Sequence, residues 1–236
     1  MIYPYQKLLP LEYENLESNN PSLAENVQTL GTLHSVLCKG LDFTSKNQFP
    51  IVLPSFRQPP EYICSLHRLR RKPESVLQNI CGHFFTSDTN IEPFWNHPFR
   101  NLQFLKKLDC IISTDFSIYT NMVFYQKMWN SFRNKLMSAF FQRNGIPLIP
   151  APSWGDLQNI ELYMEGWPEG SLIAINSTGI GHDKRCRHIW LDGYFAMLAI
   201  LKPIHIIRYG AYIEGERKEI STYYPNNNKP GYRYGS

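Results

Sequence analysis

Five short apolar runs recur along the middle of the chain, and each ends abruptly in polar, glycine or aromatic residues. They cover residues 84–88, 110–117, 146–156, 171–181 and 204–210. None has the alternating polar positions of a strand with one solvated face, which favours strands buried on both faces. Segments with helical or loop patterns separate the runs. The pattern therefore predicts parallel β-α units, in which all strand carboxyl ends lie at one edge.

The longest predicted helix spans about residues 121–144 and stops at Gly145, a residue suited to the left-handed turn after a helix. At 100° per residue, one face of this helix collects Met122, Tyr125, Trp129, Phe132, Leu136 and Phe140. We expect that face to be buried. A second helix is predicted over about 189–201, ending before Pro203, and a shorter one within 157–168.

The fold class predicted is α/β. Nearly every strand ends in polar residues, which favours a partial or irregular TIM-like barrel whose strand ends converge on one mouth. An open doubly wound sheet is the alternative, since five or six strands are too few for a full barrel.

Residues 81–220 are the predicted core domain. Residues 1–80 hold eight of the 17 prolines and are predicted to be a cover of short elements, in which 49–56 is at most an edge strand. Residues 221–236 are predicted to be a flexible tail.

Composition adds little to this picture. Hydrophobic residues make up 43% of the 236 positions, enough for a core, and the net charge of +4 tolerates an anionic ligand. Basic residues cluster at 68–72 and 184–188. Each cluster is either a solvated surface or a patch that contacts a nucleotide or nucleic acid.

The five cysteines are an odd number without close pairing. No apolar run reaches the roughly 18 residues of a membrane span, and the first residues lack the pattern of a signal peptide. We therefore expect a soluble, cytoplasmic protein with reduced thiols and no membrane contact. Its oligomeric state is left open.

Several motifs occur in an order that resembles a known family. They are Thr114 to Tyr119, Gln126 to Arg133, Ile149-Pro150, Ser153 to Asp156, Gly166 to Ser171, Ser177 to Gly179, Leu201 to Pro203 and Tyr209-Gly210, with Phe94-Trp95 and His97-Pro98 before them. From about Gly82 to Gly210 the chain resembles domain of unknown function 4417, a family of bacterial, archaeal and phage proteins. The resemblance implies an origin on a phage or other mobile genetic element, and no particular activity.

Asp115 is the leading candidate for a catalytic residue. It follows a buried strand, so its carboxylate is expected at the mouth as a general base, metal ligand or hydroxyl acceptor. The alternative is an aspartate that satisfies backbone amides of its own loop. Asp88 ends the preceding strand, and the two carboxylates together are able to bind a divalent cation or to divide acid and base roles. Ser117 is a candidate donor to a ligand.

Gln126, Asn130 and Arg133 fall on one side of the long helix, close to the Asp115 loop. They are candidate ligand-binding residues, with Arg133 suited to a phosphate or carboxylate. The alternative is an internal brace, in which Arg133 pairs with Asp115 and Asn130 caps a neighbouring loop.

Trp154 ends the third run and is predicted to stack on a base or sugar, while Asp156 binds a ribose hydroxyl or caps a helix. The loop containing Ser177 and Gly179 is a weaker candidate for phosphate binding, because it lacks the glycine and lysine positions of known phosphate loops. Tyr209 either lines the mouth or packs in the core. The spacing of His182, Cys186 and His188 only loosely resembles a zinc site.

Two hypotheses of function follow. The first is an enzyme, a hydrolase or transferase acting on a nucleotide, nucleic acid or related phosphorylated or glycosidic substrate at the strand ends. The second is a non-catalytic binding protein that sequesters a nucleotide or blocks a host or phage macromolecule. The sequence specifies neither the substrate nor a metal.

Overall fold

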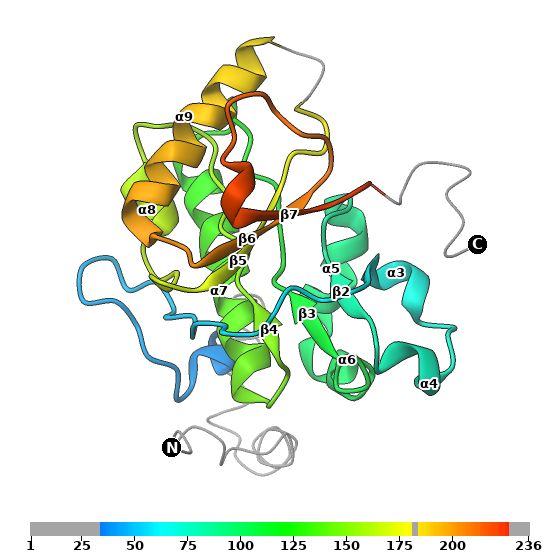
Figure 1. The fold of residues 1–236 in the computed structure, drawn as a ribbon. Helices are drawn as coiled ribbons and strands as arrows, with labels where there is room; N and C mark the ends of the chain where they lie inside the picture. The colour runs from blue at the N-terminus through cyan, green and yellow to red at the C-terminus, as the bar shows by residue number, and fades with distance from the viewer. Residues whose placement is uncertain (1–33, 181–183, 227–236) are drawn as a thin grey trace, which may run out of the picture.

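The computed structural model describes residues 34–180 and 184–226 of the chain (Figure 1). Its strands are β1 (Ile63–Ser65), β2 (Cys81–His83), β3 (Cys110–Ile112), β4 (Leu148–Ile149), β5 (Leu172–Asn176), β6 (His205–Tyr209) and β7 (Ser221–Tyr224). Its α-helices are α3 (Leu66–Leu69), α4 (Glu74–Leu77), α5 (Asp88–Asn96), α6 (Pro98–Leu105), α7 (Phe124–Arg143), α8 (Ile160–Met164) and α9 (Lys184–Leu201). Two short 3-10 helices, η2 (Ser35–Cys38) and η3 (Lys218–Ile220), complete the described elements.

The strands form two parallel sheets, one in the order β1-β2-β3-β4 and one in the order β5-β6-β7. Every ladder within them is parallel. The predicted α/β class with parallel strands is thus confirmed. Within the described residues no ladder joins the two sheets or closes them into a barrel. The TIM-like barrel is not confirmed, and the open α/β alternative is compatible with the sheets.

Four of the five apolar runs contain a strand, namely β3, β4, β5 and β6. The run at 84–88 contains none, because β2 ends at His83, directly before it. Two further strands were not predicted. β1 lies inside the segment predicted as a cover, and β7 lies at the start of the predicted tail, paired with β6 from Ile206↔Ser221 to Tyr209↔Tyr224. Residues 49–56 form no strand and contribute one antiparallel bridge, Phe43↔Pro50.

The helices lie in two groups (Figure 1). The first group is α7, α8 and α9, which pack beside β5 and β6, and the second is α3 to α6, which lie near β1, β2 and β3. The predicted helices at 121–144 and 189–201 correspond to α7 and to most of α9, and the one at 157–168 shortens to α8. Among the described helices, none is both long and apolar enough to cross a membrane.

The buried side chains form two clusters, because neighbouring strand residues point to opposite faces of a sheet. One cluster lies on the helix side of the strands. The other contains side chains from every described strand, namely Ile63, Cys81, Cys110, Ile149, Leu172, Ile207 and the partly buried Tyr224. Contacts outside the ladders also link the sheets: the Ala174 amide donates to the Pro150 carbonyl at 2.8 Å, and the Tyr224 hydroxyl donates to the Pro60 carbonyl.

The apolar face predicted for α7 is only half right. Leu136 and Phe140 are buried, whereas Tyr125 is 82% and Trp129 36% exposed. The polar residues buried on α7 are Lys127, Asn130, Ser131, Arg133, Asn134, Lys135 and Ser138. Hydrogen bonds to backbone and to distant side chains offset the cost of removing these polar groups from water. The periodicity of apolar residues did not indicate their burial, because it takes no account of such bonds.

Candidate functional site

A cavity of about 670 Å³ lies at the carboxyl edge of the strands. Its lining comes from the residues that follow β1, β2, β3, β4, β5 and β7, together with Trp190 of α9. The polar lining residues are His67, Arg68, Thr86, Ser87, Asn90, Asp115, Ser117, Tyr119, Ser153, Asn176, Thr178 and Asn226. The volume falls in the range of small-molecule sites. Of the predicted site residues, Asp115, Ser117 and Trp154 line this cavity.

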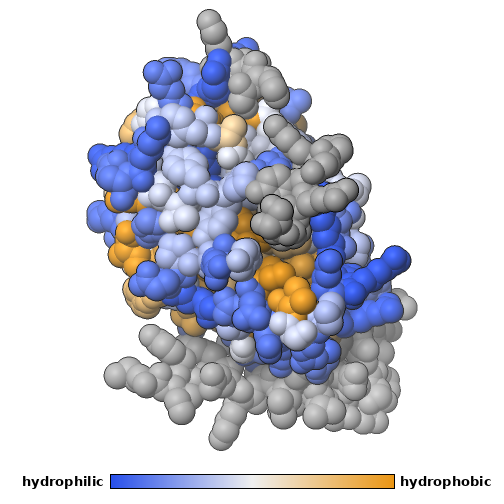
Figure 2. Space-filling model, turned by 45° about the vertical axis from the view of Figure 1, so that its right-hand side comes forward, coloured by the Kyte–Doolittle hydropathy of each residue, from blue (hydrophilic) through white to orange (hydrophobic). Residues whose placement is uncertain are grey.

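The face of the molecule shown in Figure 2 is mostly hydrophilic where its residues are described. On the face turned to the viewer in Figure 2, a small hydrophobic area lies recessed between hydrophilic side chains. A mixture of apolar and polar groups also characterises the cavity, whose apolar lining includes Phe85, Ile118 and Ile175. Such a lining suits a ligand with both a flat apolar part and polar substituents.

Asp115 is the only acidic residue in the described lining of the cavity. Its Oδ2 accepts a long hydrogen bond from Asn176 Nδ2 at 3.4 Å. Burial raises the pKa of Asp115 from 3.8 to about 6; hydrogen bonds from Asn176 and Ser153 oppose this shift, and the nearby charge of Asp88 adds to it. A carboxyl group with such a pKa is able to release and take up a proton close to neutral pH.

Asp88 lies near Asp115, but it binds the loop after β3 and does not line the cavity. Its carboxylate accepts hydrogen bonds from Ser117 N at 3.2 Å and Ser117 Oγ at 2.9 Å. The two aspartates are therefore neighbours, as the sequence suggested. The described residues contain no group of three or more His, Cys, Asp or Glu side chains placed to hold a metal ion. A divalent cation held by Asp88 and Asp115 stays a prediction.

The loop that carries Asp115 is braced by α7. Asn134 Oδ1 accepts from the Phe116 amide at 2.8 Å, and Asn134 Nδ2 donates to the Phe116 carbonyl at 3.2 Å. One turn earlier, Asn130 Nδ2 donates to the Ser117 carbonyl at 2.6 Å. These bonds fix the backbone of the two residues that follow the aspartate, and so explain why polar residues face inward on this helix.

Arg133 does not line the cavity. Its Nη1 pairs with Glu92 Oε1 at 2.9 Å, its Nη2 donates to Asn130 Oδ1 at 2.8 Å, and its guanidinium carbon lies 3.7 Å from the centroid of the Phe116 ring. The contacts favour the internal brace over the ligand-binding role for Arg133 and Asn130, with Glu92 as the partner instead of Asp115. Gln126 is exposed and also lies outside the lining.

Two tryptophans form part of the cavity wall. The rings of Trp154 and Trp190 lie 5.6 Å apart at 42°, and Trp190 Nε1 donates to the Asn176 carbonyl at 3.3 Å. Gly193 on α9 makes room for Trp154, because a Cβ there would lie 2.1 Å from the indole Nε1. Helix α9 therefore positions the indole that the sequence predicted as a stacking surface.

Asp156, two residues after Trp154, is used inside the fold. It accepts from Lys127 Nζ at 2.7 Å, Tyr163 OH at 2.9 Å and the Asn159 amide at 3.0 Å. Partial burial acts to raise the pKa of Asp156, but these hydrogen bonds outweigh it and hold the pKa below the usual value. These contacts favour a structural role over contact with a ribose, although the N-cap of α8 is Asn159 and Asp156 lies three residues before it.

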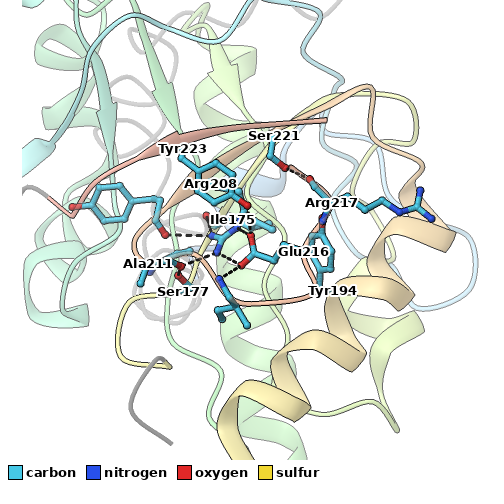
Figure 3. A network of polar contacts seen from close by, with 12 residues as sticks. Ile175, Ser177, Tyr194, Arg208, Ala211, Glu216, Arg217, Ser221 and Tyr223 are labelled. Atoms are coloured by element: carbon cyan, nitrogen blue, oxygen red, sulfur yellow. Dashed lines mark hydrogen bonds and ion pairs between the residues drawn. The ribbon is translucent and has the colours of Figure 1, made fainter. Parts of the chain in front are cut away.

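The wall formed by β5 and β6 is held by a buried ion pair (Figure 3). Arg208 and Glu216 have no exposed side-chain surface, and Arg208 Nη2 donates to Glu216 Oε1 at 2.6 Å. Glu216 also accepts from Tyr223 OH at 2.8 Å, while Arg208 Nη1 donates to the Ile175 carbonyl at 3.2 Å. The network thus connects β5, β6, β7 and the loop between β6 and β7.

The other predicted residues of this wall do not line the cavity. Ser177 is buried and its Oγ donates to the Ala211 carbonyl at 2.6 Å, a carbonyl that also accepts from Arg208. Tyr209 is buried and its hydroxyl donates to Asn226 Oδ1 at 3.0 Å. Gly179 has a φ of +86°, which suits a tight turn, and its neighbours Thr178 and Ile180 line the cavity instead. Of the loosely metal-like spacing, His182 lies outside the described residues.

Most of the described lining residues were not among the predicted site residues, and His67, Asn176 and Ser153 are three of them. His67 follows β1, and Ser65 Oγ lies 2.7 Å from its Nδ1. Burial, with the charge of Arg68 adding, lowers the pKa of His67 below 6.5. Recognising β1 in the sequence would have identified His67 as a residue that follows a strand. A strand of three residues is too short for its pattern to be recognised. Asn176 ends a predicted strand, so the strand-end rule alone could have found it.

The sequence of the chain matches the profile of one family over residues 43–224, which is more than three quarters of its length. The chain belongs to the DUF4417 family, a domain of unknown function. The match extends beyond both ends of the segment that carried the resemblance. It includes β1 and β7, the two strands missing from the predicted core.

Proteins similar to this DUF4417 chain occur in phages. It is 28% identical over 151 residues to the Gene 1 protein of Mycobacterium phage L5, covering 64% of this chain and 66% of that protein. It is 29% identical over 176 residues to the Gene 1 protein of Mycobacterium phage D29, covering 72% and 65%. The matches thus span just under two thirds of these relatives. No solved structure matches the chain.

Proposed function

We propose that the cavity binds a nucleotide or a closely related phosphorylated or glycosidic ligand, and that Asp115 acts on it as a general acid or base in a hydrolysis or transfer reaction. One observation carries the proposal: a carboxyl group with a pKa of about 6 shares one cavity with two indole rings and a His-Arg pair. Perturbed titratable groups in a cavity are typical of catalytic sites.

The ligand class follows from the kinds of groups that line the cavity. Trp154, Trp190 and Phe85 offer ring faces for a base or sugar. Arg68 and His67 supply positive or donor groups for a phosphate. Hydroxyl and amide groups of Ser153, Asn176 and Thr178 suit the polar edges of such a ligand.

Proton transfer is the reaction step that Asp115 can perform. Above pH 6 its carboxylate is able to accept a proton from a water or a hydroxyl group, and its raised pKa makes return of that proton to a leaving group easier. His67 is a second proton carrier in the same cavity, and its hydrogen bond with Ser65 fixes the orientation of the imidazole ring.

We also propose that the two sheets work as one incomplete barrel. Side chains from all described strands meet in a single cluster, and the hydrogen bonds from Ala174 to Pro150 and from Tyr224 to Pro60 bring the sheet edges together. Such an arrangement explains why residues after six of the strands contribute to one cavity.

The test is calorimetric titration of the full chain with nucleoside mono-, di- and triphosphates and with sugar phosphates. We expect one class to bind. Asp115→Asn and Trp154→Ala should each weaken that binding at least about tenfold, or roughly 1.4 kcal/mol. Asp192→Asn, which removes a partly exposed carboxylate on α9, is the matched control and should have no effect. Absence of binding by every class would refute the proposal.

The second hypothesis is a non-catalytic binding protein, and in the form that sequesters a nucleotide it differs from the first only in the fate of the ligand. Incubation of the bound ligand with the protein, followed by chromatography, separates the two hypotheses. Product formation that Asp115→Asn abolishes supports the enzyme. An unchanged ligand after tight binding supports sequestration.

A further inference from the structure

A ridge of exposed apolar side chains leads away from the cavity. We define the aromatic ridge as Tyr119, Val123, Phe124 and Tyr125, which are 59%, 64%, 43% and 82% exposed. The rings of Phe124 and Tyr125 lie 5.3 Å apart at 75°. Large apolar groups gathered on a surface commonly mark a binding site.

The ridge is continuous with the cavity, because Tyr119 belongs to both. Val123 is the N-cap of α7, and Phe124 and Tyr125 are the first residues of this helix, which also braces the Asp115 loop through Asn130 and Asn134. A ligand that fills the cavity and extends past Tyr119 therefore meets the ridge next.

A basic segment reaches the same cavity from another element. Arg68 of α3 lines it, and the exposed Arg70, Arg71 and Lys72 follow directly in the chain. Arg70 is held in place by Asn101 Oδ1 and by the rings of Phe94 and Phe104. In the described lining Arg68 and Asp115 balance each other in formal charge, so the positive charge that favours a polyanion comes from the exposed residues that follow Arg68.

We propose that the ligand is one nucleotide of a single-stranded polynucleotide, whose neighbouring bases stack on the aromatic ridge while its phosphates contact the basic segment at 68–72. This inference rests on the proposed function and names its substrate class. A free mononucleotide would fill the cavity and leave the ridge uncovered. A single strand supplies both unpaired base faces for the rings and phosphates for the arginines.

The test compares two sizes of ligand. A fluorescein-labelled ten-nucleotide single strand, in DNA and RNA form, is titrated with the full chain, and mononucleotides are titrated separately. We expect the decamer to bind at least about tenfold more tightly than the mononucleotide, since each stacked base commonly contributes a factor of about five or more. The affinity for the decamer should fall with rising salt concentration.

The decisive variant is Phe124→Ala/Tyr125→Ala, which changes only exposed rings. It should weaken decamer binding about tenfold or more and leave mononucleotide binding within about twofold. Phe56→Ala is the matched control, because Phe56 is 72% exposed and follows Ser55, which bonds to Ser171 at the amino end of β5. It should change neither affinity.

Each other outcome has a defined meaning. Mononucleotide binding without tighter decamer binding overturns the polynucleotide and leaves the proposed function standing. A double variant that keeps full decamer affinity but changes from dimer to monomer in sedimentation makes the ridge a self-association surface and overturns the inference. Equal affinity of the wild-type chain for duplex and single strand overturns the inference, because paired bases cannot stack on the aromatic ridge. Absence of binding to every nucleotide by the wild-type chain refutes the proposed function itself.

Discussion

Two acidic groups of this molecule, the buried Glu216 and the partly buried Asp115, have opposite surroundings. Glu216 is paired with Arg208 and accepts further hydrogen bonds from Tyr223 and the Ile213 amide. Asp115 has no cation among its hydrogen-bond partners in the described residues; its donors are neutral, and the bond from Asn176 is 3.4 Å long. The first group is satisfied within the fold, whereas the second keeps acceptor capacity directed to a cavity.

The contrast separates a structural charge from a candidate functional one. A buried charge is tolerated in a fold when a partner charge and hydrogen bonds replace water. Asp115 has no such partner charge among its hydrogen-bond donors, and burial, with the nearby charge of Asp88 adding, raises its pKa. An acidic group with a raised pKa at a cavity is typical of a catalytic or binding site.

The largest effect is expected for the satisfied group. Glu216→Ala leaves Arg208 buried without its counter-charge, and breaking a buried pair in this way commonly costs about 3–5 kcal/mol. Urea denaturation measures the free energy of unfolding. Glu214→Ala, which removes an exposed carboxylate two residues away, is the control and should cost less than about 0.5 kcal/mol. A loss below about 1 kcal/mol for Glu216→Ala would show that the pair is not a structural brace.

Asp115→Asn should change the free energy of unfolding in the opposite direction and stabilise the protein above pH 6. Because the pKa in the folded protein, about 6, lies above the value of 3.8, the folded state holds more protons between about pH 4 and pH 6. Stability therefore falls as the pH rises through this window, and the full cost is present above pH 6. At about 1.4 kcal/mol per pKa unit the shift corresponds to roughly 3 kcal/mol as an upper bound.

The variant should therefore be more stable than the wild type at pH 7.5, while the two should be similar at pH 4. Urea titrations at both pH values measure the difference. A variant that is destabilised at pH 7.5 would make Asp115 a structural residue and weaken the proposed function.

The smallest effect concerns the packing of the cavity wall. Gly193→Ala places a methyl group against the Trp154 indole and should cost about 1–3 kcal/mol through overpacking. In the double variant Gly193→Ala/Trp154→Ala the clash is absent, so the cost of the alanine at 193 should largely disappear. Thermal unfolding of the wild type, both single variants and the double variant measures the coupling. Additive effects would show that the indole is held by something other than Gly193.

Much of the fold could be predicted from the sequence. Four of the five apolar runs contain a strand and the fifth directly follows β2, and the long helix ends where Gly145 follows it. β1 and β7 could not be recognised, because a three-residue strand and a strand in a segment rich in tyrosine and asparagine carry too little apolar pattern. Both segments form strands because they pair with a neighbouring strand, β1 with β2 and β7 with β6.

The site was less predictable than the fold. The strand-end rule led to Asp115, Ser117 and Trp154, which line one cavity. It also led to Asp156, and the polar stripe on the long helix led to Arg133; their partners Lys127 and Glu92 lie 29 and 41 residues away in the chain. No local pattern reveals such distant pairings, so a polar residue used as a brace and one used for a ligand look alike in sequence.

The close contact between Trp154 and Gly193 has a consequence for the history of the family. An indole at position 154 in this conformation leaves no room for a side chain at position 193. We expect DUF4417 chains that lose the glycine to lose the tryptophan as well, and chains that keep both to keep the same cavity wall. The two positions should therefore have changed together during evolution, although 39 residues and one sheet strand separate them.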